Sequence, residues 1–237
     1  MLLAAGLGTR LRPITNSIPK CLVPINGKPL LGYWLDTLNN AGITQVLVNL
    51  HYLENCVKAF IKSLPEQEGV QTVYEPVLLG TAGTIRKNSA FTGSSGPIMV
   101  IHADNLCLSN LRVFVNAHRD RPIGTAITMM TFLTDNPKDC GVVELDDRNV
   151  VTSFQEKIEN PSGNLANGAV YVFEQSVIDW ISSQNREYLD ISKDVLPQFI
   201  GKIFTWPADG LHIDIGSPAS LKKANSIFDQ QRKSMGT

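Results

Sequence analysis

The sequence predicts an α/β protein built on a Rossmann-like, doubly wound sheet that is mixed but mostly parallel. Two observations carry this prediction. Apolar runs such as 44–50 and 98–101 alternate with segments of helical periodicity. The chain of 237 residues is also long enough for one large α/β domain or two small ones. A strand–helix–strand order predicts parallel strands joined by crossover helices.

The elements of the first half follow from apolar spacing and from glycine and proline. Leu30, Leu31, Trp34, Leu35 and Leu38 form the apolar stripe of a helix over 29–40, which Ala41-Gly42 ends. Pro65 stops a helix over 53–64. Further helices are predicted over 81–90 and 111–118, and strands over 1–5, 44–50, 70–74, 98–101 and 125–132.

The second half changes character at residue 141. A polar turn at 146–149 separates two apolar runs, which predicts antiparallel strands over 141–145 and 150–154. Ser217 is a good N-cap with proline after it, so a last helix begins there. The other predictions are strands over 169–173, 202–206 and 211–213, and helices over 175–182 and 191–199. We therefore expect a smaller antiparallel region here.

Composition excludes several classes of protein. Hydrophobic residues make up 43% and charged residues 18%, as in ordinary globular proteins, and the net charge is −1. This near-neutral charge gives no sign of a broad basic surface, so nucleic-acid binding and membrane binding are not expected. We expect no membrane span and no signal peptide. The cysteines form no C-x-x-C pair, so reduced thiols and a cytoplasmic location are expected instead of a zinc site; they are Cys21, Cys56, Cys107 and Cys140.

The most informative segment is a glycine loop that follows the first predicted strand. Gly6 and Gly8 allow backbone N–H groups to approach a phosphate, because no Cβ is in the way. Arg10, Arg12 and Lys20 add cations to the same loop. Backbone donors together with fixed positive charge suit a polyphosphate.

Other kinds of glycine loop fit less well. A dinucleotide-binding fingerprint needs a third glycine, where Leu11 stands, and an acidic residue near Ile25 and Asn26. A Walker P-loop needs a Gly-Lys-Ser/Thr string, which the sequence lacks. An ordinary glycine-rich turn between a strand and a helix remains the alternative. Ligands of such sheets lie beyond the carboxyl ends of the strands, which is where this loop and Asp104 are predicted.

Motifs in a fixed order resemble those of the sugar-1-phosphate nucleotidyltransferases, also called NDP-sugar pyrophosphorylases. The resemblance covers nearly the whole chain, and ordered motifs together are more specific than any one alone. The motifs are Leu3-Ala4-Ala5-Gly6-Leu7-Gly8-Thr9-Arg10-Leu11-Arg12-Pro13, Pro19-Lys20, Leu79-Gly80-Thr81-Ala82-Gly83, Ala103-Asp104, Gly141-Val142-Val143-Glu144, Glu156-Lys157, Asn167-Gly168-Ala169-Val170-Tyr171 and Asp214-Ile215-Gly216.

The resemblance implies a fold, a domain plan and a reaction. The fold is the GT-A-like nucleotidyltransferase fold, with one catalytic domain over 1–237 and no C-terminal β-helix. Residues 1–135 are expected mainly to bind nucleotide and 136–216 mainly sugar phosphate. The reaction transfers a nucleotidyl group from a nucleoside triphosphate to a sugar 1-phosphate and releases pyrophosphate, by a Mg²⁺-dependent in-line displacement. The attacking phosphate, with a second pKa near about 6, is already ionised, so no general base is required.

The resemblance also assigns roles to residues. Arg10 and Lys20 are the catalytic cations, and Asp104 and Asp214 are the Mg²⁺ ligands. The nucleotide-binding residues are Leu3, Ala4, Ala5, Gly6, Gly8, Thr9, Glu75, Gly80, Thr81, Ala82 and Gly83. The residues expected to bind the sugar phosphate are Gly141, Glu156, Lys157, Asn167 and Gly168.

Other functions and other substrates stay open at this point. A glycosyltransferase would want Asp-x-Asp where the chain has His102-Ala103-Asp104. An inactive regulatory homologue that binds nucleotide sugars should have lost Arg10, Lys20 or an aspartate, and all are present. The preferred substrates are GTP and a mannose- or heptose-type 1-phosphate, and the alternative is UTP or dTTP. A homodimer is compatible with the resemblance, but no residue pattern fixes it.

Overall fold

The computed structural model describes residues 1–65, 68–93 and 96–235. The described residues form two compact units that interleave along the chain. Unit 1 comprises Met1, Leu78–Ile101 and Leu111–Asp209, and unit 2 comprises Leu2–Val77, His102–Asn110 and Gly210 onward.

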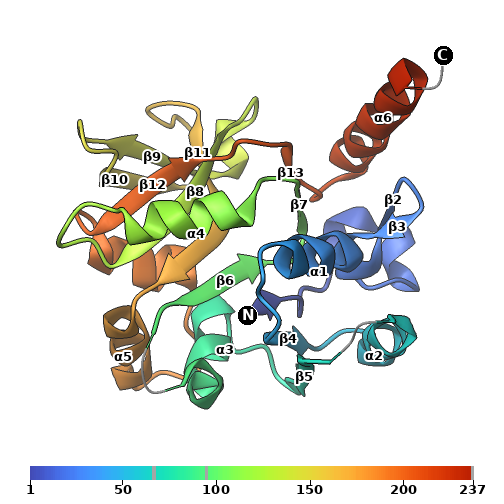
Figure 1. Ribbon diagram of the computed structural model, residues 1–237, viewed down its shortest axis with the longest axis horizontal. Helices are drawn as coiled ribbons and strands as arrows, with labels where there is room; N and C mark the ends of the chain where they lie inside the picture. Colours follow the sequence, from blue (N-terminus) through green and yellow to red (C-terminus); the bar gives the residue numbers. More distant parts are fainter. Residues whose placement is uncertain (66–67, 94–95, 236–237) are drawn as a thin grey trace. The chain divides into compact units, whose positions relative to one another are not determined.

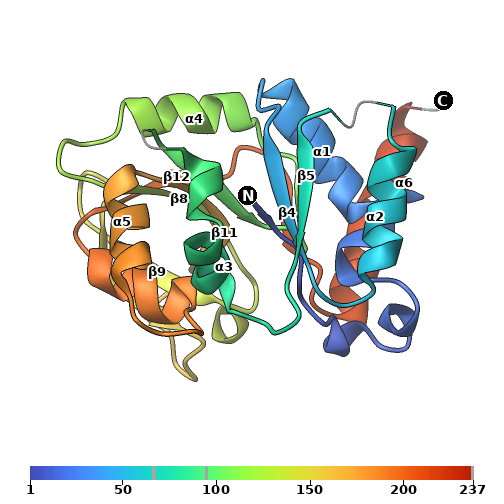
Figure 2. The ribbon, with the colours of Figure 1, turned by 90° about the horizontal axis from the view of Figure 1, so that it is seen from below.

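The parallel strands of unit 2 are β1 (Leu2–Leu3), β4 (Val46–Leu50) and β5 (Val70–Tyr74). They hydrogen-bond in the order β1-β4-β5, with Leu2 opposite Val48 and Leu50 opposite Tyr74. Figure 2 shows β4 and β5 running side by side. Every residue of β4 is buried, as expected of a strand within a parallel sheet.

Helices α1 (Leu30–Asn40) and α2 (Glu54–Ser63) of unit 2 match their predictions within two residues. Gly42 ends α1 with a left-handed φ of 78°. Trp34 lies on the buried face of α1, and its indole Nε1 donates to the backbone oxygen of Asn105, 2.8 Å away. The longer helix α6 (Pro218–Met235) starts where Ser217 and Pro218 predict.

Short antiparallel pairs complete unit 2. Strands β2 (Pro24–Ile25) and β3 (Lys28–Pro29) form a hairpin, which the sequence analysis did not predict. Its turn residues Asn26 and Gly27 both have positive φ, as tight hairpins require. The hairpin lies beside α6, and the Asn26 N–H donates to the Asn225 side chain (Figure 1). Strand β7 (Asn105–Cys107) pairs with β13 (His212–Asp214).

Strand β11 (Leu165–Phe173) organises the sheet of unit 1. It runs antiparallel to β6 (Ile98–His102), β8 (Ile127–Leu133) and β9 (Gly141–Leu145). Strand β10 (Val151–Glu156) extends β9 in antiparallel sense, and β12 (Ile203–Pro207) pairs with β8 in parallel. The register of β11 shifts between Asn167 and Tyr171. The antiparallel region predicted for the second half is therefore confirmed.

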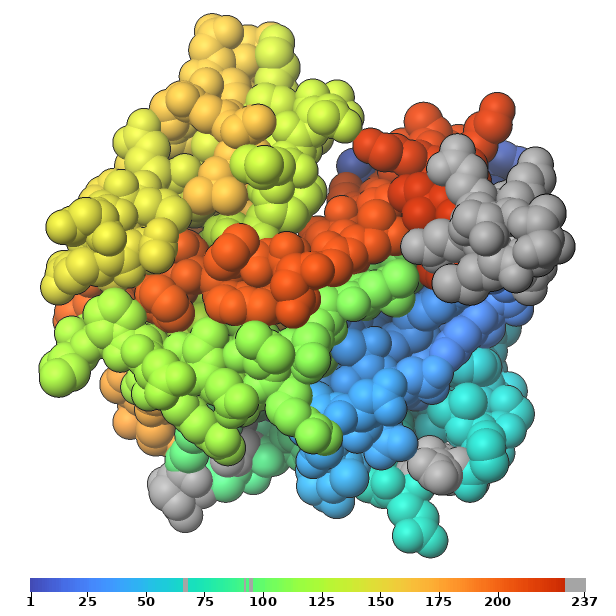
Figure 3. Space-filling model, turned by 45° about the horizontal axis from the view of Figure 1, so that its top comes forward, coloured from blue at the N-terminus to red at the C-terminus, as the bar shows by residue number. Residues whose placement is uncertain are grey.

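The helices of unit 1 are α3 (Thr81–Lys87), α4 (Leu111–Arg119) and α5 (Gln175–Ser183). In Figure 1 α3 lies next to α5, and Figure 3 shows α4 alongside β12. The Phe114 ring of α4 packs on Trp206 of β12 with centroids 5.5 Å apart. The α/β class with a mixed sheet is thus confirmed.

Two predicted helices of unit 1 are wrong in type or length. The segment predicted over 191–199 is a π-helical turn (Ile191–Val195) followed by a 3-10 turn (Leu196–Phe199). Pro197 has no N–H to continue an α-helical ladder. The helix predicted over 81–90 ends at Lys87, and a 3-10 turn (Ser89–Thr92) follows. Apolar spacing alone does not separate these forms from an α-helix.

Candidate active site

The glycine loop of unit 2 leaves β1 at Leu3 and enters a 3-10 turn (Thr9–Leu11). The N–H of Ala4 donates to Asn49 Oδ1 at 2.7 Å, which ties the start of the loop to β4. Gly8 has a φ of 63°, and a Cβ there would lie 3.0 Å from Thr15 Cγ2. Only glycine meets both constraints without strain.

The predicted nucleotide-binding residues of this loop divide by exposure. The side chains of Leu3 and Ala5 are buried, so they anchor the loop. Gly6 and Thr9 are exposed, and nothing lies within 4 Å of where a Gly6 Cβ would be. The exposed part of the loop is therefore open to a ligand at the residues where backbone N–H groups were expected to meet phosphate.

The predicted cations and carboxylates of unit 2 meet in one cluster. Lys20 Nζ lies 2.7 Å from Asp104 Oδ2 and 3.7 Å from Asp214 Oδ1. Arg10 Nη2 lies 3.9 Å from Asp214 Oδ2. These residues lie far apart in the sequence, so the fold of unit 2 brings them together. We call Arg10, Lys20, Asp104 and Asp214 the charged cluster.

A hydrophobic core behind the charged cluster holds these side chains in place. Leu11, which follows Arg10, and Ile215, which follows Asp214, are both buried in one core group with Leu106 of β7. Strand pairing places Asp214 opposite Asn105, the neighbour of Asp104. The Ile215 N–H also donates to the Asp104 backbone oxygen at 3.3 Å. Charged residues thus alternate with buried ones, and packing limits how far the charges can separate.

Gly216 permits the close approach of two charged groups. A Cβ at this position would lie 2.6 Å from Asp214 Oδ2 and 2.8 Å from Arg10 Nη2. These distances are shorter than any ordinary van der Waals contact. The glycine of the Asp-Ile-Gly motif therefore leaves space that the ends of the Asp214 and Arg10 side chains occupy.

The Asp104 carboxylate is ionised despite its surroundings. Burial by itself raises its pKa, but the ammonium of Lys20, together with His102, outweighs burial, so the pKa lies below the ordinary value. At neutral pH the cluster therefore presents a carboxylate and an ammonium in contact.

The donor set fits a hard divalent cation. Mg²⁺ is commonly held by one or two carboxylates completed by phosphate oxygens and water. The carboxylates of Asp104 and Asp214 converge on one ammonium and keep 42% and 43% of their side chains exposed. Within residues 1–65, 68–93 and 96–235, no His, Cys, Asp and Glu side chains gather in threes or more around a possible metal position. Phosphate oxygens of a substrate and water are common further ligands of Mg²⁺.

Asn49 and Glu75 form a buried pair next to the glycine loop. Asn49 Nδ2 donates to Glu75 Oε1 at 3.2 Å while its Oδ1 accepts from Ala4. His51 Nδ1 hydrogen-bonds to the Glu75 backbone oxygen at 2.7 Å. Glu75 is 1% exposed, so its side chain lies beneath the surface. Sequence reasoning missed Asn49, although a polar residue inside the apolar run of β4 was an available signal.

In unit 1, the predicted nucleotide-binding segment 80–83 packs against residues 189–191. The N–H groups of Ala82 and Gly83 both donate to the Leu189 oxygen at 2.9 Å. Thr81 Oγ1 donates to Asp190 and accepts from the Ile191 N–H. A Cβ on Gly80 would lie 2.4 Å from the Leu189 oxygen. These N–H groups already donate to the protein's own backbone. A ligand would therefore contact the surface of this segment but would not accept hydrogen bonds from those N–H groups.

The predicted sugar-phosphate residues Gly141, Glu156 and Lys157 are neighbours in unit 1. Gly141 pairs with Glu156 across β9 and β10, and a Cβ on Gly141 would lie 2.6 Å from Glu156 Oε2. Lys157 has a positive φ of 51°, and its Nζ lies 3.3 Å from Glu156 Oε1. With 62% of its side chain exposed, Lys157 can reach a ligand at little cost.

Asn167 and Gly168 lie at the irregularity of β11. Asn167 Nδ2 donates to the Tyr171 hydroxyl at 2.7 Å, and its Oδ1 accepts from the Ala169 N–H at 2.9 Å. Burial raises the pKa of Tyr171 well above its ordinary value, with Glu156 and Asp190 contributing, so the phenol stays protonated. Glu156, Asn167, Tyr171 and Asp190 form what we call the hydroxyl cluster. Tyr171 and Asp190 were not among the predicted site residues.

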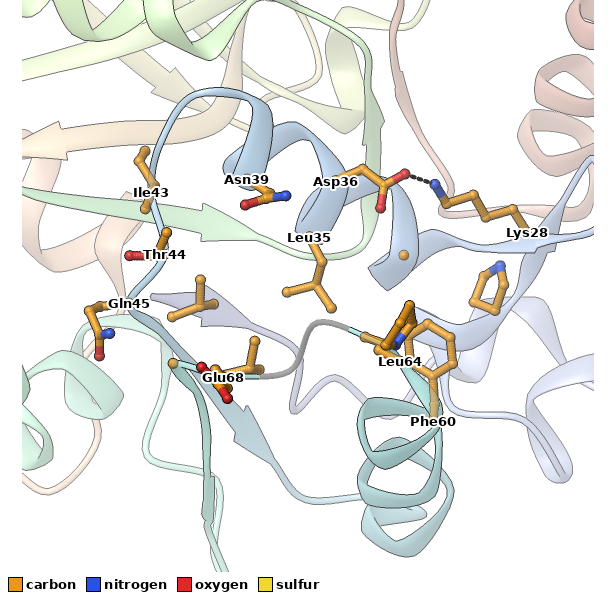
Figure 4. A pocket seen from close by; sticks show the side chains of 16 residues that line it. Lys28, Leu35, Asp36, Asn39, Ile43, Thr44, Gln45, Phe60, Leu64 and Glu68 are labelled. Atoms are coloured by element: carbon orange, nitrogen blue, oxygen red, sulfur yellow. Dashed lines mark hydrogen bonds and ion pairs between the residues drawn. The ribbon is translucent and has the colours of Figure 1, made fainter.

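A cavity of about 820 Å³ lies elsewhere in unit 2, between α1 and α2. Figure 4 shows Leu35 of α1 and Phe60 of α2 pointing into it, with the Lys28–Asp36 ion pair at its rim. Its lining includes Val46 and Val70, the first residues of β4 and β5, whereas Asn49 and Glu75 lie at the other end of these strands. None of the predicted site residues lines this cavity.

Comparison with known proteins identifies the family. The family model described as nucleotidyl transferase matches residues 1–231. The chain therefore belongs to this family, which includes the sugar-1-phosphate nucleotidyltransferases that the motifs resemble.

Named relatives carry different substrates in their names. The mannose-1-phosphate guanylyltransferase catalytic subunit beta of Drosophila melanogaster is 30% identical over 233 residues, 96% of this chain and 62% of the relative. The UTP–glucose-1-phosphate uridylyltransferase of Synechocystis is 32% identical over 214 residues, 84% of this chain and 54% of the relative. The chain thus spans 54% to 62% of the length of these relatives.

A solved structure of similar length shares the fold. The crystal structure of HddC from Yersinia pseudotuberculosis, complexed with GMP-PN, is 27% identical with a TM-score of 0.79. The match covers 96% of this chain and 97% of HddC. In the part of the chain that the structure describes, helices long and apolar enough to cross a membrane are absent.

Proposed function

We propose that this chain transfers a nucleotidyl group from a nucleoside triphosphate to a sugar 1-phosphate and releases pyrophosphate. The observation that carries the proposal is the charged cluster, in which Lys20 lies within 4 Å of both Asp104 and Asp214. Cations and metal-binding carboxylates beside a glycine loop suit the handling of a triphosphate. Family membership supports the same reaction class.

The proposed chemistry is an in-line displacement. An oxygen of the sugar 1-phosphate forms a bond to the α-phosphorus, and the bond from that phosphorus to the β-phosphate oxygen breaks. Pyrophosphate leaves with the electron pair, so negative charge grows on the leaving group. The main tasks for the protein are then to hold like-charged groups together and to stabilise that charge.

Arg10 and Lys20 divide the task of binding phosphate. Arg10 has 65% of its side chain exposed and presents a planar fork, which suits the β- and γ-phosphates and the departing pyrophosphate. Lys20 is nearly buried and would supply a point charge near the α-phosphate. The exposed loop at Gly6 and Thr9 would provide backbone donors.

Asp104 and Asp214 would hold a divalent cation, with Mg²⁺ proposed as the ion. Such a metal, when bound, would neutralise charge on the phosphates and orient them for displacement. In this chain, the packing of Leu106 and Ile215 in one hydrophobic core fixes the backbone next to the two carboxylates.

The hydroxyl cluster of unit 1 is proposed to bind the sugar. The Glu156 carboxylate would accept from sugar hydroxyls, and the Lys157 ammonium would pair with the sugar phosphate. Asn167 would be oriented by its hydrogen bond to Tyr171. Gly141 leaves room above Glu156. The division into a mainly nucleotide-binding part over 1–135 and a mainly sugar-phosphate-binding part over 136–216 belongs to this proposal, as do a homodimer and a cytoplasmic location.

GTP and a mannose- or heptose-type 1-phosphate are the proposed substrates. Mannose-1-phosphate guanylyltransferases recur among the named relatives, and the HddC structure of matching length holds GMP-PN. The alternative is UTP or dTTP. The uridylyltransferase of Synechocystis, at 32% identity, supports UTP as the second candidate.

A pyrophosphate-release assay tests the proposal. GTP, UTP and dTTP are each paired with mannose, heptose and glucose 1-phosphates in Mg²⁺ buffer, with Asp214→Asn as the inactive control. We expect pyrophosphate with GTP and a mannose- or heptose-type phosphate. Release with UTP or dTTP instead would change the substrate assignment. No release from any pair, with nucleotide-sugar binding by calorimetry, would instead identify an inactive regulatory homologue.

A further inference from the structure

The ammonium of Lys20 occupies the position between the two carboxylates of the charged cluster. It donates a hydrogen bond to Asp104 Oδ2 at 2.7 Å and lies 3.7 Å from Asp214 Oδ1. The Lys20 side chain is 8% exposed, whereas the two aspartates are more than 40% exposed. The ammonium is therefore enclosed, whereas the two carboxylates that contact it remain partly exposed.

The local fold requires a cation at this position. Asp104 and Asp214 are brought together by the pairing of β7 and β13, and two adjacent carboxylates repel each other unless a positive charge lies nearby. Lys20 compensates both, because its Nζ lies within 4 Å of an oxygen of each carboxylate. The Lys20 backbone is anchored, since the next residue, Cys21, is buried. Lys20 also packs close to Gly8, because the Lys20 Cβ lies 3.1 Å from where a Cβ on Gly8 would be.

The same oxygens are the proposed ligands of a divalent cation. A hard cation binds carboxylate oxygens directly, so it competes with the Lys20 ammonium for Asp104 Oδ2. Arg10 is placed differently, because its contact to Asp214 is 3.9 Å and most of its side chain is exposed. Loss of the Arg10 charge should therefore matter less for metal binding than loss of the Lys20 charge.

We propose that Lys20 is a placeholder cation, a role that rests on the proposed function. Without metal, it holds the Asp104 and Asp214 carboxylates together. When a divalent cation binds with a triphosphate, Lys20 gives up the carboxylate oxygens and its ammonium turns to a phosphate oxygen. Triphosphate binding then favours metal binding, because phosphate supplies the partner that Lys20 loses.

Manganese binding to the nucleotide-free protein tests this role. Mn²⁺ is titrated against the wild type and against Lys20→Met, with electron paramagnetic resonance reporting the unbound ion. We expect Lys20→Met to bind Mn²⁺ about tenfold more tightly, within the range of ordinary coupling between sites. Arg10→Met removes a nearby charge and should change the affinity less. Lys28→Met removes a cation paired with Asp36 outside the site and should change nothing.

A second measurement uses the wild type, in case Lys20→Met does not fold. Reductive methylation of lysines is followed by mass spectrometry with and without Mg²⁺ and GTP. We expect Lys20 to react slowly alone and severalfold faster with Mg²⁺ alone, since the released ammonium becomes accessible. With both ligands the reaction should slow again. Lys28 serves as the internal reference whose rate does not respond.

The outcomes separate this role from the proposed reaction. Unchanged or weaker Mn²⁺ binding by folded Lys20→Met overturns the placeholder role, as does a Lys20 methylation rate that Mg²⁺ does not raise. Either result leaves the reaction standing if the wild type releases pyrophosphate. Tighter Mn²⁺ binding by Lys20→Met, without any turnover by the wild type, would support the placeholder role and contradict the proposed reaction.

Discussion

The charged cluster of unit 2 and the hydroxyl cluster of unit 1 are built from different interactions. In the charged cluster, ammonium, guanidinium and carboxylate groups lie 2.7 to 3.9 Å apart. In the hydroxyl cluster, the central contact is a hydrogen bond between the uncharged groups of Asn167 and Tyr171. The first arrangement is the one we propose for phosphate and metal, and the second is the one we propose for the sugar.

The difference teaches how each cluster keeps its geometry. The charged cluster depends on mutual neutralisation, so the removal of one member leaves another charge without its partner. The hydroxyl cluster depends on directional hydrogen bonds and on the β11 irregularity that places Asn167. Substitutions should therefore affect turnover most in unit 2 and affinity for the sugar phosphate most in unit 1.

The largest effect is expected for Asp104→Asn. The change removes a proposed metal ligand and leaves Lys20 with a weaker partner, so kcat/KM should fall about a thousandfold, the loss of several kcal/mol of charge stabilisation. Steady-state pyrophosphate release measures it. Asp36→Asn, which breaks an exposed ion pair with Lys28, is the matched control and should stay within twofold. Comparable losses in both variants would contradict the cluster's role.

Two glycine substitutions compare the regions directly. Gly216→Ala crowds Asp214 and the exposed end of Arg10, so kcat should fall about tenfold to a hundredfold with little change in Tm. Gly141→Ala places a methyl 2.6 Å from the Phe154 ring, which should cost about 1–3 kcal/mol of stability. Kinetics and urea unfolding measure the two effects.

Gly163→Ala is the control for both, because nothing lies within 4 Å of its added Cβ. It should alter neither kinetics nor stability beyond about 0.5 kcal/mol. A larger loss of stability in Gly216→Ala than in Gly141→Ala would contradict the expected difference between the two regions.

A smaller and more specific effect is expected for Glu156→Gln. The amide keeps the size of the side chain but weakens acceptance from sugar hydroxyls, so KM for the sugar 1-phosphate should rise about tenfold, a change of about 1.4 kcal/mol. KM for the nucleotide should not change. Initial rates with each substrate varied in turn measure both constants. A rise confined to the nucleotide KM would assign Glu156 to the other substrate.

The smallest effect concerns a buried network of unit 1 outside both clusters. His118 hydrogen-bonds to Thr128 and Glu174, and Arg121 also pairs with Glu174. Burial, then Arg121, lowers the pKa of His118 below its ordinary value, although Glu174 acts in the opposite direction. Below pH of about 6.5 the unfolded chain takes up a proton that the folded chain refuses, so stability falls as pH drops through that range.

Urea unfolding at several pH values measures this dependence. His118→Gln should be less stable than the wild type at pH 7.5 but should lose less stability on acidification. A wild-type stability that rises below pH 6.5 would show that Glu174 outweighs burial. Pyrophosphate release at pH 7.5 should be the same in both proteins if the network only stabilises unit 1.

The sequence predicted more of the helices and strands than of the contacts between them. Strand β5 falls on its predicted residues, and α1 starts one residue inside its predicted range, because apolar spacing and Gly42 are local signals. The hairpin at Asn26-Gly27 was missed although its turn residues signal it. The prediction over 191–199 failed since a π turn shares the apolar spacing of an α-helix.

The same limit applies to the site. The motifs named Arg10, Lys20, Asp104 and Asp214, which the structure brings together. They assigned no role to Asn49, which accepts a hydrogen bond from Ala4 far away in the sequence, or to Tyr171, whose hydrogen bond with Asn167 forms at the irregularity of β11. Nor did they show that the N–H groups of Ala82 and Gly83 are already used by Leu189.

The sequence by itself determined the class of fold, the order of most strands and helices, and the kinds of charged residue that form the charged cluster. These depend on local periodicity, turn residues and motifs, which a chain carries in its own order. Only the tertiary structure decided that Lys20 lies enclosed between two carboxylates and that Gly216 leaves room beside them. Such contacts arise from strand register and from a shared core, which bring together residues that are distant along the chain.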